Sequence, residues 1–172
     1  REGVLFVGGF SHPPNADALK YFLDNMWDEI YAQIKAPFYI VGSNATDEIK
    51  ALHNEAKGII FKGFVSEEEL KELYEKVRLV VVPLRYGAGV KGKVIEALYY
   101  NDPVITTSVG AEGIDNSYNQ MLVADEPGDF VEKCVNLYNN KEALKAMSKA
   151  ADDYVRNKHS IEAVWEIIRE DF

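Results

Sequence analysis

A glycine-rich segment with two lysines is the part of this sequence best suited to binding phosphate groups. It reads YGAGVKGKVIEALYY over residues 86–100 and follows a run of valines. Backbone N–H groups that converge at a helix N-terminus bind anions, and Lys91 and Lys93 would add positive charge. Arg85 precedes them, and no acidic residue lies within 85–93. The segment therefore predicts a cradle that binds a diphosphate without a metal ion.

Two known phosphate-binding motifs match this segment only in part. The P-loop pattern G-x-x-x-x-G-K-[ST] fits as far as Lys93, but Val94 replaces the hydroxyl residue that ligates magnesium. The dinucleotide pattern G-x-G-x-x-G fits residues 87–92, and Glu112 follows about 20 residues later, where a ribose-binding acid is expected. This match opens the fourth strand–helix unit rather than the first, so an NAD-binding oxidoreductase domain remains only an alternative.

Glu96 lies about one turn into the helix that follows the glycines. Its neighbours Ile95, Ala97 and Leu98 indicate that this helix is largely buried. A buried carboxylate is costly unless it is paired or used. Glu96 is therefore a candidate to accept hydrogen bonds from ribose hydroxyl groups next to the diphosphate.

The elements that must position these residues alternate along the chain. The predicted strands span 3–10, 38–43, 59–65, 79–84, 104–109 and 121–125, and the predicted helices span 15–34, 66–77, 90–100, 128–139, 141–157 and Ser160 to the C-terminus. The strands are continuously apolar, as in a parallel sheet covered on both faces. We therefore predict one α/β domain over residues 1–172, with a Rossmann-like, doubly wound, mainly parallel six-stranded sheet and helices on both faces.

The composition narrows the classes of function. The 172-residue chain carries a net charge of −9, which argues against general nucleic-acid binding. No apolar run approaches the roughly 20 residues that span a membrane, and no signal peptide is apparent. The single cysteine, Cys134, excludes an intrachain disulfide and a thiolate zinc site. We expect a cytoplasmic protein that needs no metal or other cofactor.

Ligands of doubly wound sheets bind beyond the carboxyl ends of the strands. The corresponding loops are residues 8–12, 42–44, 63–65, 85–93 and 110–113, and most carry glycine near the strand end. Glycine permits tight turns and close approach of a ligand, although turns after strands often contain glycine for structural reasons alone.

These segments together resemble the C-terminal, donor-binding domain of the group 1 (family 4) glycosyltransferases. The similar stretches are GVLFVGGFSHPPN, FYIVGSN, the run from IIFKGFV to GAEGI, and MLVAD, which cover nearly the whole chain in order. Members of the family have the GT-B fold, two facing Rossmann-like domains. The resemblance implies retaining transfer of a hexose from a UDP- or GDP-sugar, without an obligatory metal, for example in polysaccharide biosynthesis.

The resemblance also implies a partner domain. The N-terminal, acceptor-binding domain of the family is absent from this chain, which begins at Arg1 rather than Met and so suggests either a domain cut from a longer protein or a processed chain. Any peripheral attachment to a membrane would then occur through that missing domain. We expect the chain alone to bind donor or nucleotide weakly and to transfer little or no sugar.

Roles for single residues follow from the family's E-x7-E motif. Its second glutamate matches Glu96 and would hold the ribose hydroxyls, whereas its first, which contacts the donor hexose, falls at Ala88. The family's Arg and Lys pair after the first strand is also missing, because residues 10–14 read FSHPP. Lys91 and Lys93 would instead stabilise the charge that develops on the diphosphate leaving group.

The predicted substrate-binding set extends beyond the motif. By resemblance, backbone near Phe64 and Val65 would contact the base, and residues 110–113 would line the far side of the cleft. The set comprises Gly9, Phe10, Phe64, Val65, Arg85, Gly87, Ala88, Gly89, Val90, Gly92, Glu96 and Glu112.

Several alternatives stay open at this point. Arg85 could bind phosphate or form an ordinary ion pair at the strand end, and Glu112 could line the cleft or cap a loop. His12 is interpreted as a loop histidine rather than a substrate contact. For the whole domain, the alternatives are a non-catalytic nucleotide-binding or interaction module on the same fold, and the NAD-binding oxidoreductase domain.

Overall fold

Six parallel strands form the sheet at the centre of the computed structural model, which describes residues 1–159 and 161–170. The strands are β1 (Val4–Val7), β2 (Phe38–Val41), β3 (Ile59–Gly63), β4 (Leu79–Val82), β5 (Val104–Thr106) and β6 (Met121–Val123). Their order is β3-β2-β1-β4-β5-β6, and each adjacent pair is parallel. The predicted doubly wound α/β sheet is confirmed, although most strands end two or three residues earlier than predicted.

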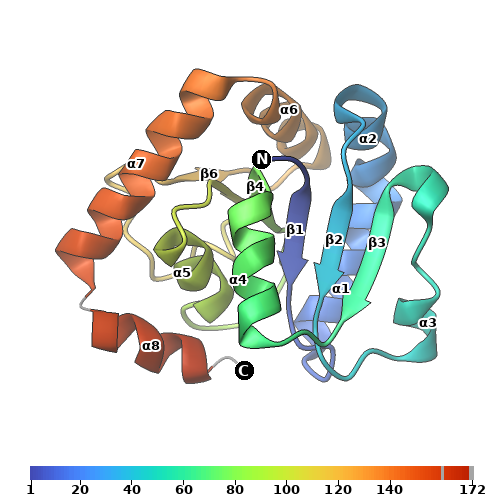
Figure 1. Ribbon diagram of the computed structural model, residues 1–172, viewed down its shortest axis with the longest axis horizontal. Helices are drawn as coiled ribbons and strands as arrows, with labels where there is room; N and C mark the ends of the chain where they lie inside the picture. The colour runs from blue at the N-terminus through green and yellow to red at the C-terminus, as the bar shows by residue number, and fades with distance from the viewer. Residues whose placement is uncertain (160, 171–172) are drawn as a thin grey trace.

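Helices cover both faces of this sheet. They are α1 (Pro13–Phe22), a π-helical turn η1 (Leu23–Trp27), α2 (Asp28–Ile34), α3 (Asp47–Lys50), a 3-10 turn η2 (Glu55–Lys57), α4 (Glu67–Lys76), α5 (Gly92–Tyr99), α6 (Pro127–Tyr138), α7 (Lys141–Lys158) and α8 (Ile161–Glu170). Figure 1 shows α4 in front of the sheet and α1 behind it. The prediction of helices on both faces is therefore confirmed.

The helix predictions need three corrections. The helix predicted over 15–34 begins at Pro13, and the π-helical turn divides it into α1 and α2. α5 begins at Gly92 rather than at residue 90, because the glycine loop before it is not helical. The short elements α3 and η2 were not expected. The predicted last helix agrees with α8, while Ser160 and residues 171–172 lie outside the described residues.

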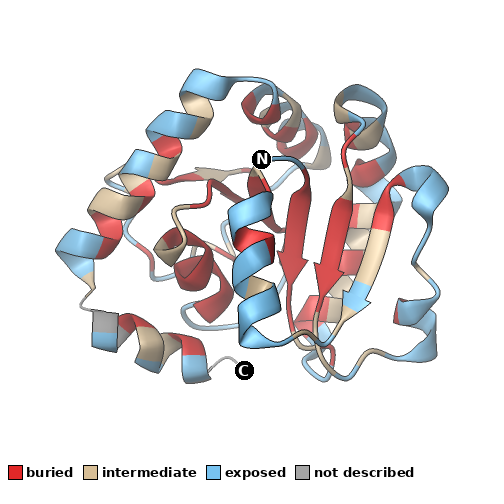
Figure 2. Cartoon of the chain, in the orientation of Figure 1, coloured by how far each residue is buried: buried red, intermediate tan, exposed pale blue. Residues whose placement is uncertain are grey.

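The core lies on both faces of the central strands. β1, β2 and β4 are buried along their whole length, whereas the edge strand β3 is partly exposed (Figure 2). Each fully buried Val, Leu, Ile or Phe side chain stabilises the fold by roughly 1.5–3 kcal/mol. On the α1 face, Phe38 packs between Phe22 and Trp27, with ring centroids 5.1 and 4.9 Å apart. The sequence segments that form the central strands are apolar because helices cover both faces of the sheet.

The order of the strands reverses next to β1. Val4 pairs with Phe38 of β2 on one side and with Leu79 of β4 on the other. Because β1 and β4 are parallel neighbours, the loops after them leave the same edge of the sheet side by side. Crevices at such reversal points are the usual ligand sites of doubly wound sheets.

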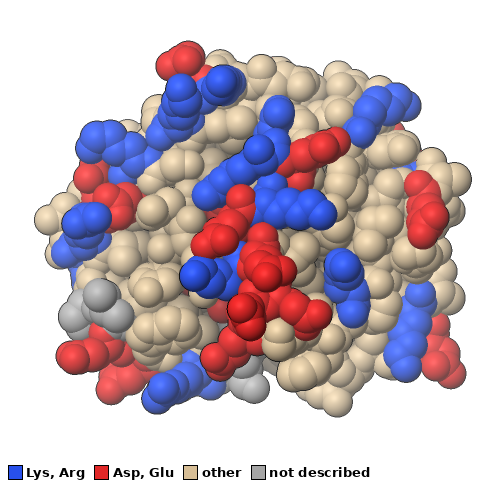
Figure 3. Space-filling model, in the orientation of Figure 1, with Lys and Arg blue, Asp and Glu red and all other residues tan. Residues whose placement is uncertain are grey.

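Acidic side chains gather over α4 on the face shown in Figure 3. They belong to Glu67, Glu68, Glu69, Glu72 and Glu75. Ser66 and Glu69 form a capping box at the start of α4, with the Glu69 N–H donating to the Ser66 hydroxyl at 3.1 Å and the Ser66 N–H donating to the Glu69 carboxylate at 2.8 Å. None of the described helices is both long enough and apolar enough to cross a membrane.

Candidate functional site

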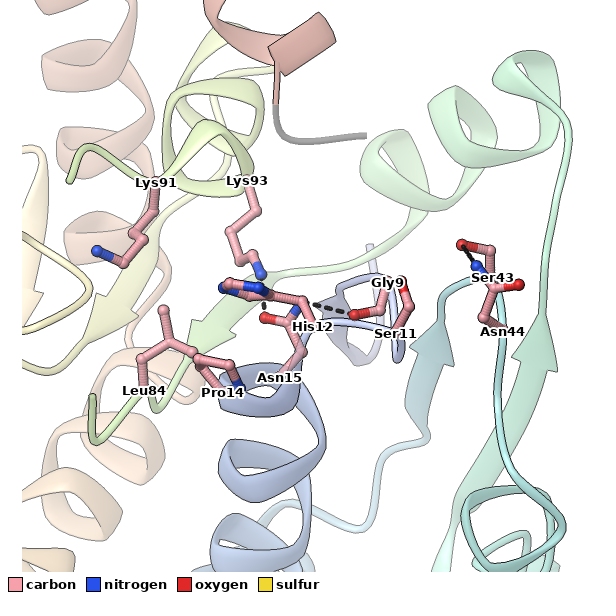
Figure 4. A pocket seen from close by; sticks show the side chains of 10 residues that line it. All are labelled: Gly9, Ser11, His12, Pro14, Asn15, Ser43, Asn44, Leu84, Lys91 and Lys93. Carbon is pink, nitrogen blue, oxygen red and sulfur yellow. Dashed lines mark hydrogen bonds between the residues drawn. The ribbon is translucent and has the colours of Figure 1, made fainter. Parts of the chain in front are cut away.

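A pocket of about 290 Å³ opens where the loops after β1, β2 and β4 meet (Figure 4). Its lining residues are Gly9, Ser11, His12, Pro14, Asn15, Ser43, Asn44, Leu84, Lys91 and Lys93. None of these described lining residues is acidic. The pocket thus lies at the strand-order reversal and carries a positive local charge in a molecule whose net charge is −9.

The two predicted cationic residues both line this pocket. Lys91 and Lys93 are each only 7% exposed, because they stand at the start of α5, which is buried through Leu98. The Lys91 ammonium donates to the carbonyl oxygens of Gly87 and Gly89, at 3.3 and 2.5 Å. An anion in the pocket would be a stronger acceptor for this ammonium than these carbonyl oxygens.

Lys93 is bound to a residue that the sequence did not mark. Its ammonium donates to the side-chain oxygen of Asn15, and the Asn15 amide nitrogen donates to the carbonyl oxygen of Gly9 at 2.8 Å. Figure 4 shows Lys93 pointing toward Asn15, while the Lys91 ammonium points away from it. The two lysines therefore approach the pocket from different directions.

The glycine loop has the backbone form that its sequence predicts. Gly87 and Gly89 have φ values of +117° and +88°, a region that L side chains rarely adopt. Ala88 and Val90 between and after them are exposed. The Glu112 carboxylate, in a loop after β5, lies 3.7 Å from the Lys91 ammonium, although Glu112 is not among the residues that line the pocket.

Glu96 is buried in α5 and bound to a second helix. It is 5% exposed, and the buried hydroxyl of Tyr74 in α4 donates to its carboxylate at 3.1 Å. Burial, followed by the charge of Glu96, raises the pKa of Tyr74 well above its usual range, so this hydroxyl keeps its proton. Glu96 is not among the residues that line the 290 Å³ pocket, and its predicted contact with ribose remains a prediction.

Arg85 forms an ion pair in this structure, and its predicted contact with phosphate remains a prediction. Its guanidinium donates to both carboxylate oxygens of Asp17, at 2.9 and 2.5 Å, and stacks over the ring of Tyr21 at 4.4 Å. The Arg85 hydrogen bond holds the pKa of Asp17 below its usual value. Arg85 is thus an ion-pair residue in this structure, outside the pocket lining.

Other predicted contacts also lie outside this pocket. The Phe10 side chain is buried and stacks on Phe6, so any contact with a ligand would come from its backbone. Phe64 follows β3 and is 81% exposed, and Val65 next to it is half-buried. Among the predicted residues, the pocket brings together Gly9, Lys91 and Lys93.

Five polar residues of the pocket were not predicted as site residues: Ser11, His12, Asn15, Ser43 and Asn44. His12 was interpreted as a loop residue, but it lines the pocket together with both lysines. Ser43 and Asn44 follow β2, in a loop that the sequence identified only as a strand-end turn. The one signal in the sequence was that Ser43 and Asn44 follow a predicted strand. Using this signal required knowing that the strand lies next to β1.

A second cavity of about 380 Å³ lies on the other side of the glycine loop. It is mainly apolar, and its lining residues are Gly89, Val90, Ile95, Gly113, Ile114, Tyr154, His159 and Ile167. Within the residues that the structure describes, no three His, Cys, Asp or Glu side chains are grouped so as to hold a metal ion. The expectation that no metal or other cofactor is needed remains a prediction.

Known proteins are similar to this chain in sequence. The family model described as glycosyl transferases group 1 matches residues 1–140. An uncharacterized 44.6 kDa protein in the cps region of Klebsiella pneumoniae is 24% identical over 172 residues, which cover 96% of this chain and 44% of that protein. The chain therefore spans less than half the length of this relative.

Solved structures share the fold. TarM from S. aureus, in a complex that contains UDP, matches with a TM-score of 0.74 at 20% identity, over 98% of this chain and 35% of that one. The C-terminal domain of LpcC, a group 1 family glycosyl transferase from Francisella tularensis, matches with a TM-score of 0.69 at 18% identity, over 93% of this chain and 87% of that one.

Proposed function

The chain belongs to the glycosyl transferases group 1 family, and from this membership we propose that it is the donor-binding domain of a retaining glycosyltransferase. The donor would be a nucleoside-diphosphate sugar, and the reaction would transfer its hexose to an acceptor. The observation that carries the proposal is the pocket at the strand-order reversal, with Lys91 and Lys93 in its wall and no acidic side chain among its described lining residues.

The proposed chemistry is electrostatic stabilisation of a leaving group. When the bond between the sugar and the diphosphate breaks, negative charge develops on the diphosphate oxygens. Two ammonium groups that are already buried and already hydrogen-bonded would stabilise this charge with little rearrangement. We propose that Lys91, Lys93 and the backbone of residues 87–92 perform this role without a bound metal.

The nucleoside would extend from the diphosphate toward α5 and the end of β3. Glu96 would accept the ribose hydroxyls, with Tyr74 holding its carboxylate in place through the 3.1 Å hydrogen bond. The backbone near Phe64 and Val65 would meet the base. The UDP in the TarM complex favours a uridine donor, although a GDP-sugar fits the same chemistry.

The remainder of the enzyme would bind the acceptor. The chain covers 44% of its Klebsiella relative, whose location in the cps region favours a role in polysaccharide synthesis. We propose that an N-terminal domain of the same parent protein faces the carboxyl edge of the sheet, supplies the acceptor site and carries any attachment to a membrane.

Calorimetric titration of the chain with UDP, GDP and inorganic pyrophosphate tests the proposal. We expect saturable binding of at least one nucleotide. Lys93→Ala should weaken it about 10-fold or more, because a charged hydrogen bond is lost, whereas Lys71→Ala on the exposed surface of α4 should leave it unchanged. Glu96→Ala should weaken the binding of the nucleotides more than the binding of pyrophosphate. A folded chain that binds none of the three ligands would overturn the assignment.

Ala88 favours a second candidate function. It stands where the family's first motif glutamate contacts the donor hexose, so the chain lacks one carboxylate of the usual site. A nucleotide-binding module without transferase activity would tolerate this change. Sugar transfer by the complete parent protein would exclude this candidate, and nucleotide binding without any transfer would favour it.

A further inference from the structure

We propose that Asn15 is a positioning residue that holds the Lys93 ammonium in the diphosphate pocket. The inference rests on the proposed function, because it concerns how one of the two cationic groups is presented to the ligand. Asn15 belongs to α1, after β1, and Lys93 belongs to α5, after β4, so the contact joins the two loops of the strand-order reversal.

The orientation of the Asn15 amide is fixed by its two partners. Its nitrogen donates to the Gly9 carbonyl oxygen at 2.8 Å, and its oxygen accepts from the Lys93 ammonium. The opposite orientation would place the amide N–H groups against an ammonium, which has only donors, and the amide oxygen against a carbonyl oxygen. The network therefore specifies which side of Asn15 faces Lys93.

Packing against Gly8 also restricts the Asn15 side chain. A Cβ atom on Gly8 would lie 2.8 Å from the Asn15 side-chain carbon, so the amide packs directly against the glycine backbone. Asn15 is only 4% exposed. With its side chain confined by Gly8 and its nitrogen bound to Gly9, its oxygen presents a fixed acceptor to Lys93.

A neutral acceptor suits a lysine that must bind an anion. The lysine side chain is a flexible stem with a compact charge, so it needs an anchor to point in one direction. The amide oxygen of Asn15 anchors the ammonium without itself adding a negative charge, whereas a carboxylate at the same position would repel a phosphate. Lys91 is anchored differently, by the carbonyl oxygens of Gly87 and Gly89 in its own loop, with the Glu112 carboxylate 3.7 Å from its ammonium.

A double-mutant cycle separates positioning from a general structural role. UDP binding is measured by calorimetry for the wild-type chain, Asn15→Ala, Lys93→Ala and the double variant. We expect Asn15→Ala to weaken binding about 5- to 10-fold, and the double variant to match Lys93→Ala within about 2-fold, because Asn15 acts through Lys93. Asn25→Ala is the matched control, since Asn25 binds its own helix at Tyr21 and lies on the exposed surface.

Asn15→Asp keeps the proposal testable if Asn15→Ala fails to fold. It retains the shape that packs on Gly8 but places a carboxylate against Lys93. We expect a loss greater than that of Asn15→Ala and of at least about 10-fold. Unchanged UDP binding by Asn15→Asp would overturn the positioning role. So would a loss of affinity in the double variant that equals the product of the losses in Asn15→Ala and Lys93→Ala. Absence of UDP, GDP and pyrophosphate binding by the wild-type chain would overturn the proposed function as well.

Discussion

Asp102, just after α5, is a carboxyl group fully buried in the protein. Its Oδ1 accepts from Arg1 at 2.5 Å, while its Oδ2 has no hydrogen-bond partner among the described residues. Burial raises the pKa of Asp102 from 3.8 to about 8, and the neighbouring Arg1 only partly opposes this rise. Between a pH of 3.8 and about 8, the folded protein therefore holds a proton on Asp102 that the unfolded chain releases.

The pKa of Asp102 predicts how stability depends on pH. Because the folded-state pKa is raised, the stabilising proton is present below about pH 4 and is lost as the pH rises to about 8. Relative to Asp102→Asn, the wild type should lose up to about 1.4 kcal/mol per pH unit across this window. Urea unfolding of both proteins at pH 5, 6.5 and 8 measures the difference.

A suitable control for this measurement is Asp24→Asn, which changes an exposed carboxylate and should follow the wild type at each pH. A constant stability difference between wild type and Asp102→Asn from pH 5 to 8 would show that Asp102 does not take up a proton on folding. Such a result would also indicate that the ion pair with Arg1 outweighs the burial of the carboxyl group.

At the residue scale, the sequence predicted the cations of the site better than their partners. Lys91 and Lys93 were found because glycine spacing and local charge are visible along the chain. Asn15 was missed, since its importance depends on a contact with Lys93 across a separation of 78 residues. The ion pair of Arg85 likewise depends on Asp17, which only the fold brings near.

At the scale of elements, six strands and their parallel arrangement were predicted from apolar runs, but their ends were not. The predicted first strand reached Phe10, whereas β1 ends at Val7, although the Gly8 N–H still donates to the Val41 carbonyl oxygen of β2. Strand order was not predictable, since it depends on which face each crossover helix packs. The pocket follows from that order, because it forms between the β1 and β4 loops.

The backbones at the carboxyl ends of β1 and β2 approach each other closely at Gly8 and Gly42. The Gly42 N–H donates to the Gly63 carbonyl at 2.9 Å, and a Cβ on Gly42 would lie 1.9 Å from the Gly8 carbonyl oxygen. This oxygen belongs to backbone, which cannot yield as a flexible side chain would. The Gly8–Gly9 segment that anchors Asn15 is thus kept in place partly by the absence of a side chain at residue 42.

The same substitution should therefore have opposite effects at two glycines. Gly42→Ala should destabilise the protein by about 2 kcal/mol or more, because the new methyl group forces β1 and β2 apart. Gly128 in α6 has no atom within 4 Å of a Cβ, so Gly128→Ala should stabilise by about 0.5–1 kcal/mol. Urea unfolding measures both, and equal effects would contradict the close approach at Gly42.

At the scale of the whole molecule, the carboxyl edge of the sheet combines polar and apolar features. The cationic pocket opens there, and three exposed large apolar side chains, Phe64, Tyr86 and Val90, follow β3 and β4 at the same edge. The chain as a whole carries a net charge of −9. This edge is the surface that we expect to face the acceptor-binding part of the proposed enzyme.

Because the proposed donor and acceptor sites lie in different domains, the chain alone should bind the donor, whereas the complete parent enzyme should also transfer its sugar. The chain should bind a UDP- or GDP-sugar yet leave it intact for hours, because the acceptor and the groups that enclose the sugar would come from the other domain. NMR signals of the anomeric proton measure this directly. Rapid release of sugar by the chain alone would show that its own residues complete the active site.

In the parent enzyme, Lys93→Ala should act mainly on the chemical step. The charge on the diphosphate grows as the glycosidic bond breaks, so an ammonium that stabilises it contributes more in the transition state than in the bound donor. We expect kcat to fall about 100-fold or more, with a smaller rise in KM for the donor. A variant that raises KM about 100-fold and keeps kcat would show that Lys93 only binds the donor, and stabilisation of the leaving group would then have to come from Lys91 and the backbone of the glycine loop.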